Sequence, residues 1–154
     1  MTLSTHTAIG AIIGFSFGNP IVGFILGFIS HFLVDMIPHG DSEIADQYKV
    51  QKVNVKKILA YMMIDAVTAI ILIVTLFETR SADNTAVLGA SIAGSVLPDL
   101  LVGIYEVTKS KYLLWFNRLH FFFHDYFIIK YHDIKLPYSL LGQFIFIFLV
   151  FKTI

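Results

Sequence analysis

The chain contains no cysteine among its 154 residues. This excludes disulfide bonds, thiolate-held zinc and a cysteine nucleophile, so any bound metal must be held by nitrogen and oxygen. Charged residues are also scarce: they form 14% of the chain, against roughly 25% in a typical soluble domain. The net charge is zero, so no basic field is present to attract nucleic acid.

Apolar residues are correspondingly abundant. They form 56% of the chain and give a mean hydropathy of +0.76, which is typical of integral membrane proteins. No Lys or Arg precedes the first apolar run, so we read it as a helix and not as a cleavable signal peptide. Turn signals such as Gly18-Asn19-Pro20 and Pro38 divide the chain into six apolar segments, at 5–17, 21–37, 55–77, 85–107, 112–129 and 137–151.

We therefore predict an all-α fold, a polytopic membrane helical bundle of about six helical segments that forms a single integral membrane domain over 1–154. The first two segments form an N-terminal helical hairpin. The segments are marginal to adequate in length for a bilayer core of about 30 Å. Segment 112–129 is rich in aromatic residues, and it can either span the bilayer or lie in its interface.

Basic residues predict the orientation. Two loops, after the hairpin and after the fourth segment, carry most of them: Lys49, Lys52, Lys56, Lys57, Lys109, Lys111 and Arg118. The loop between segments three and four has only Arg80, beside Glu78 and Asp83. The positive-inside rule places both termini in the cytoplasm and the protein in the inner membrane, although Lys130 and Lys135 oppose this arrangement.

Several ionisable residues lie inside or at the edge of these apolar segments. Asp65, Asp99 and His120 each lie eight to ten residues from a flanking lysine, which is roughly 12–15 Å from the same predicted surface. The others near that depth are His6, His31, Asp35 and His124. Small residues recur every four positions on the same helix face as the ionisable residues, as in Gly23, Gly27, His31 and Asp35. Such rows of small residues let helices approach closely in lipid. The ionisable side chains are therefore expected to converge between helices, in the cytoplasmic leaflet.

Histidine and aspartate in this arrangement point to a metal site. His31 with Asp35, and His120 with His124, are i, i+4 pairs that place two ligands over one another on a helix face. We predict a divalent metal, with zinc first and manganese or iron fitting the same donors. The predicted ligands are His6, His31, Asp35, Asp99, His120 and His124.

Other interpretations stay open for single residues. An i, i+4 pair can be a hydrogen-bonded pair or a proton relay, and Asp65 or Asp99 can simply bond a neighbouring helix. His39 and Asp41, in the PHGD stretch, can be a solvated loop, and Asp125 can orient His124.

The motif Gly27-x-x-Ser30-His31-x-x-x-Asp35 resembles the YdjM-like (LexA-regulated) predicted membrane-bound metal-dependent hydrolases. The early His6, the Leu97-Pro98-Asp99 element and the His120/His124 pair are similar to elements of the same family. The resemblance covers most of the chain in short motifs and implies a hydrolase.

We therefore expect a metal-dependent hydrolase in which the metal activates water, with Asp65 as the preferred general base and Asp99 as a second catalytic candidate. A site one leaflet deep suggests membrane lipids as partners and an amphiphilic, phosphate-containing substrate such as a lipid phosphate or phosphodiester. Association with a second copy of the chain stays open. The alternative is a small metal-ion or proton-coupled transporter that uses the same residues. A structural or regulatory membrane protein would leave the shared depth unexplained.

Overall fold

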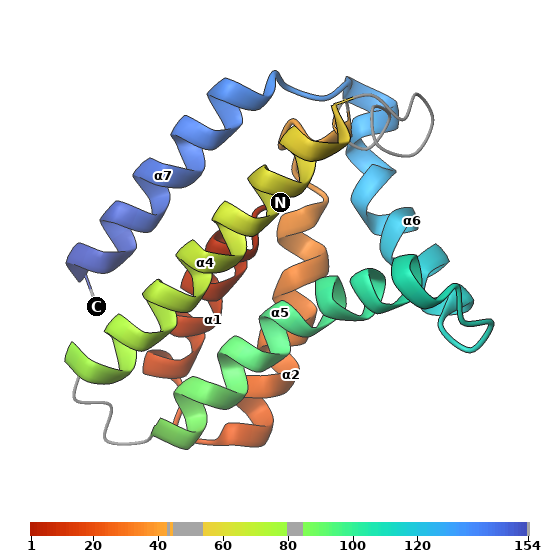
Figure 1. Cartoon of the computed structure of the whole chain (residues 1–154). Helices are drawn as coiled ribbons and strands as arrows, with labels where there is room; N and C mark the ends of the chain where they lie inside the picture. Colours follow the sequence, from red (N-terminus) through yellow and green to blue (C-terminus); the bar gives the residue numbers. More distant parts are fainter. Residues whose placement is uncertain (43, 45–53, 80–84, 154) are drawn as a thin grey trace.

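The computed structural model describes residues 1–42, 44, 54–79 and 85–153, and in this part of the chain the secondary structure is entirely helical (Figure 1). The all-α prediction is confirmed, and each predicted segment corresponds to one helix with ends shifted by only a few residues. The helices are α1 (Leu3–Ser16), α2 (Pro20–Asp35), α4 (Val55–Thr79), α5 (Thr85–Thr108), α6 (Leu114–Tyr131) and α7 (Leu136–Thr153).

Local capping explains the hairpin of α1 and α2. The Thr2 side chain accepts a hydrogen bond from the backbone N–H of Thr5 and begins α1. Asn19 begins α2 in the same way, because its side-chain oxygen accepts from the N–H groups of the next turn, and Pro20 follows at the first helical position. The Gly-Asn-Pro turn therefore ends one helix and starts the next.

Helix α5 packs against both arms of this hairpin. The contact is close because glycines of the hairpin face the backbone of α5. A Cβ atom at Gly10 would lie 2.7 Å from the Cα of Ile92, and one at Gly14 would lie 2.7 Å from the Cα of Leu88. The predicted rows of small residues are thus the surfaces on which these helices approach one another.

The apolar core lies further along α1 than His6. It is formed by small and aliphatic side chains of α1, α4, α5 and α7, namely Ala8, Ala11, Leu72, Leu76, Leu88, Ile92 and Val150. Helix α5 also contains Pro98, and Figure 1 shows that this helix is bent along its length. A proline inside a helix is a common cause of such a bend, since its ring clashes with the preceding turn and it lacks an N–H.

Among the described residues, two helices, α4 and α5, are long and apolar enough to cross a membrane. Helices α6 and α7 pass the same test only as a pair, and they are bent against each other by 119°. Helix α2 is apolar but shorter. Four residues used for the predicted orientation, Lys49, Lys52, Arg80 and Asp83, lie outside the described residues.

Candidate metal centre

Four helices bring their ionisable residues to one place between them. His6 is in the second turn of α1, His31 and Asp35 are in the last turns of α2, Asp99 follows the proline of α5, and His120 is in α6. The glycine contacts described above set the separation of α1 and α5, and a Cβ at Gly27 of α2 would likewise overlap the backbone oxygen of Ser91 in α5. Backbone packing therefore fixes the distances between these side chains.

The first cluster, which we call the deep group, consists of His31, Asp35, Asp99 and His120. One ligand atom from each lies within 4.8 Å of the other three. His31 Nε2 lies 3.6 Å from Asp99 Oδ1, and His120 Nε2 lies 3.5 Å from Asp35 Oδ2. Ligand atoms bound tetrahedrally to zinc at 2.0–2.1 Å are about 3.4 Å apart, so these separations are close to those of a coordination shell.

Polar atoms in the deep group lack the hydrogen bonds that burial normally requires. His31 Nε2 and Asp35 Oδ2 are buried without a hydrogen-bond partner, and so is Nδ1 of His120. An unpartnered buried polar atom costs roughly 1–3 kcal/mol, so native proteins rarely leave several together. A cation bound between the imidazole nitrogen and the carboxylate oxygen would satisfy both, and the donor set therefore fits a divalent metal.

The tautomer of His31 also favours a metal. Its Nδ1 lies 2.9 Å from the backbone oxygen of Ser95. A carbonyl oxygen only accepts, so Nδ1 must carry the proton and Nε2 presents its lone pair to Asp35 and Asp99. This is the arrangement of a metal-binding histidine whose second nitrogen is held by the protein.

His6 lies beside the deep group, on the other side of its carboxylates. Its ring stacks on that of His31 with centroids 4.1 Å apart. Its Nε2 is 3.4 Å from Asp35 Oδ1 and 4.0 Å from Asp99 Oδ2, which are the oxygens that His31 and His120 do not face. Both ring nitrogens of His6 are buried without a hydrogen-bond partner.

A second cluster, the outer group, consists of His39, Asp41 and His124. Asp41 Oδ2 lies 2.8 Å from His39 Nε2 and 3.2 Å from His124 Nε2. Burial by itself would raise the pKa of the Asp41 carboxyl, but the hydrogen bonds with His124 and His39 outweigh it and hold this pKa well below its usual range. The structure thus separates the predicted ligands: His124 belongs here and not with His31, Asp35, Asp99 and His120.

The loop that carries His39 and Asp41 is tied to the turn between α6 and α7. Asp133 accepts hydrogen bonds from the backbone N–H groups of Gly40 and Ser42 and from the Ser42 hydroxyl. Gly40 has a φ of +83°, and a Cβ at this position would lie 2.7 Å from the Cα of Leu136. Only glycine fits both the backbone conformation and the space.

A positive charge lies between the two groups. The amino group of Met1 is 2.5 Å from Asp35 Oδ1, 2.7 Å from His39 Nε2 and 3.8 Å from Asp41 Oδ2. The Met1 amino group thus contacts residues of both groups.

Asp65 does not join either group. Its carboxylate accepts hydrogen bonds from the backbone N–H groups of Leu3 and Ser4, at 2.6 and 3.2 Å, and from the Ser4 hydroxyl at 2.7 Å. The free N–H groups of a first helical turn need acceptors, and Asp65 supplies them for α1. Its predicted role as general base stays a prediction, but its geometry is that of a helix cap.

His39, Asp41 and Asp133 are not among the ligands predicted from the sequence. A signal for His39 was present, because Gly27, His31, Asp35 and His39 continue one row at four-residue steps. No comparable pattern marks Asp133, which reaches the outer group from a point 92 residues after Asp41 in the chain.

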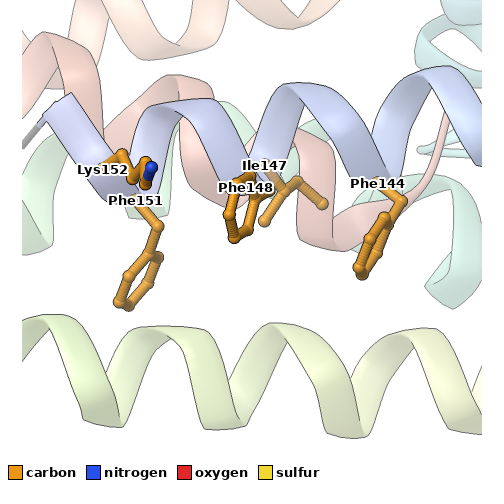
Figure 2. A pocket seen from close by; sticks show the side chains of 5 residues that line it. All are labelled: Phe144, Ile147, Phe148, Phe151 and Lys152. Atoms are coloured by element: carbon orange, nitrogen blue, oxygen red, sulfur yellow. The ribbon is translucent and has the colours of Figure 1, made fainter.

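Two shallow hollows on the surface have different surroundings. Figure 2 shows one on α7, where Phe144, Phe148 and Phe151 project toward α4, and none of its lining residues belongs to either His/Asp group. The other is on α6 and adjoins the outer group through Asp125, whose carboxylate lies 2.6 Å from His124 Nδ1. Its lining residues are Asn117, Arg118, Phe121, Phe122, Asp125, Tyr126 and Ile129.

Comparison of the chain with family models, curated proteins and solved structures gives no match. The functional argument therefore rests on the sequence and the geometry of these two groups.

Proposed function

We propose that this chain is a multi-pass membrane protein that hydrolyses an amphiphilic phosphate ester with a divalent metal bound in the deep group. The observation that carries the proposal is that two ligand atoms of the short apolar helix α2, His31 Nε2 and Asp35 Oδ2, are buried without a hydrogen-bond partner. Helix α2 packs against α5, which is long and apolar enough to cross a membrane.

Membrane insertion is supported by the outer surfaces of the long helices. On α4, Ile64 is 67% exposed and Ile71 is 61% exposed. Such a continuous apolar surface would be unfavourable in water and is satisfied by lipid. The distribution of lysines favours the inner membrane, with the site toward the cytoplasmic leaflet.

A metal in the deep group would lower the pKa of a bound water and polarise a phosphoryl oxygen. Within this group, Asp99 is the residue that substrate can reach, because its side chain is 28% exposed while those of His31, Asp35 and His120 are at most 5% exposed. Asp99 Oδ2 faces His6 and not the other two histidines, so it is the carboxylate oxygen best placed to accept a proton from attacking water. We therefore transfer the proposed general-base role from Asp65 to Asp99, with His6 beside it.

The hollow on α6 supports a phosphate-containing lipid as the substrate class. The guanidinium of Arg118 can bind a phosphate group, and the aromatic side chains of Phe121 and Phe122 can contact acyl or prenyl chains. Zinc is the proposed metal, with manganese and iron compatible with the same donors. The motif resemblance to the YdjM-like hydrolases implies the same class of reaction.

The rival proposal is a small metal-ion transporter. The feature that favours it is the presence of two cation-compatible groups side by side between helices, joined by Asp35 and His39 at 3.9 Å. Ionisable residues in membrane segments often mark ion pathways.

Turnover and flux distinguish these proposals. Detergent-purified protein is screened against lipid phosphates and phosphodiesters with and without a chelator, and the same protein is tested for metal uptake in proteoliposomes. We expect hydrolysis that both the chelator and Asp35→Asn abolish, and that Asp99→Asn lowers about 100-fold or more. The control Glu78→Gln, at the far end of α4 and outside both groups, should retain turnover. Metal flux without hydrolysis of any substrate would overturn the proposal and support the transporter.

A further inference from the structure

We infer that the outer group binds a second divalent ion, so that the site is a two-metal centre bridged by Asp35. The inference deepens the proposed function, since it rests on a metal in the deep group as its neighbour. Its residues are His39, Asp41 and His124, and for the first two the sequence alone left open whether they form a site or a solvated loop.

The rings of the outer group are oriented toward Asp41 in the manner of a metal site. His39 Nδ1 lies 2.7 Å from the backbone oxygen of Ile37 and donates to it, which fixes the ring. His39 Nε2 is hydrogen-bonded to a carboxylate oxygen of Asp41 at 2.8 Å. A divalent ion bound here would displace the proton of this hydrogen bond, because a histidine binds metal in its neutral form.

His124 of α6 contacts the same carboxylate with a similar orientation of its ring. Its Nδ1 lies 2.6 Å from Asp125 Oδ1, and its Nε2 lies 3.2 Å from the same oxygen of Asp41 that His39 faces. A histidine that donates one N–H to a carboxylate and binds a metal through the other nitrogen is the usual arrangement of such sites. The second oxygen of Asp41 is buried without a hydrogen-bond partner.

Asp35 connects the two groups. Its Oδ2 faces His31 and His120 of the deep group, whereas its Oδ1 faces His39 Nε2 at 3.9 Å and the amino group of Met1. That amino group also contacts His39 and lies 3.8 Å from Asp41. The outer ion would displace this amino group from His39, and the Asp35 carboxylate would then lie between the two ions of a two-metal hydrolytic site.

The proposed second ion gives a function to Asp133, which holds the loop of His39 and Asp41 in place. Asp133 fixes the backbone on both sides of Asp41 through Gly40 and Ser42, and it is not itself a ligand. It is a positioning residue: its loss should weaken the outer ion and leave the deep ion in place.

Metal content and electron paramagnetic resonance of the purified, manganese-loaded full chain test the inference. The wild type should bind two equivalents and give the spectrum of a spin-coupled pair. Asp41→Asn, which removes a ligand, should bind one equivalent and give the spectrum of an isolated ion. Asp133→Ala, which releases the loop that carries the ligands, should give the same result. His132→Gln, an exposed histidine outside both groups, is the matched control and should behave as wild type.

One equivalent in the wild type, or an unchanged coupled spectrum in both folded variants, would overturn the second site. Circular dichroism confirms that the variants retain their helices. Metal content and the spectrum do not depend on turnover. Two bound ions without hydrolysis would contradict the proposed function alone. Hydrolysis with one bound ion would contradict this inference alone.

Discussion

Ser95, Ile37 and Asp125 each accept a hydrogen bond from the Nδ1 of a histidine in the two groups. Two of these acceptors are backbone carbonyls, whose positions are set by helix α5 and by the end of α2. The hydrogen bonds fix ring orientation and leave Nε2 facing the carboxylates. At the scale of single residues, these hydrogen bonds orient the histidines in a way that could hold a metal ion.

Asp65 provides a residue-scale prediction, because capping and general-base catalysis respond differently to substitution. Asp65→Asn keeps one oxygen that accepts from the first turn of α1, whereas Asp65→Ala removes both. We expect Asp65→Ala to lower the free energy of unfolding by about 0.5–2 kcal/mol, the usual effect of losing a helix cap. Asp65→Asn should lower it by less and should leave turnover close to wild type.

Thermal denaturation in detergent and the hydrolysis assay measure these two effects. Turnover that collapses in Asp65→Asn while the thermal transition is unchanged would restore Asp65 as the general base.

At the scale of elements, helix α5 sets the geometry of the site by packing closely against the hairpin. Gly94 lies against the backbone of Phe24 in α2, and Gly10 and Gly14 of α1 lie against the backbone of Ile92 and Leu88 in α5. In lipid, association of helices depends on such packing because burial of apolar surface gives no advantage. Helix positions, and with them the distances within the deep group, depend on these small residues.

Gly94→Ala tests this dependence, and Gly103→Ala on the same helix is its matched control. A Cβ at residue 94 would overlap the carbonyl oxygen of Phe24, whereas one at residue 103 has no atom within 4 Å. We expect Gly94→Ala to destabilise the fold by about 1–3 kcal/mol and to lower metal content, because α2 must move away from α5. Gly103→Ala should match the wild type in both measurements. Equal melting and equal metal content for the two variants would contradict the account.

The helices could be predicted from the sequence because apolar runs end at local signals, such as Asn19-Pro20 and Pro38, that act without tertiary contacts. The convergence of His31, Asp35, Asp99 and His120 followed from counting residues along each helix. Counting residues gives the position of a side chain along its helix but not which other helix it faces. It therefore did not show that Asp65 faces the first turn of α1. It also did not predict the outer group, since the path of a loop depends on a distant anchor, here Asp133.

At the scale of the whole molecule, the apolar core and the polar centre occupy different parts of the bundle. The buried cluster around Leu72, Leu76 and Leu88 lies toward the far ends of α1 and α4. The first residues of α1 and the last turns of α2 carry His6, His31 and Asp35 and lie near the amino terminus, whose amino group contacts Asp35. This separation lets the core stabilise the helices while the centre retains polar atoms that are unsatisfied without a ligand.

X-ray absorption at the metal edge of the purified, zinc-loaded protein shows directly whether these side chains bind a metal. We expect a first shell of nitrogen and oxygen atoms at roughly 2.0–2.1 Å, together with the outer-shell scattering of imidazole rings and no sulfur. His31→Ala combined with His120→Ala should remove much of the imidazole contribution, and His132→Gln should not. Zinc surrounded by water oxygens alone, or an imidazole signal that is the same in the double variant, would contradict the account.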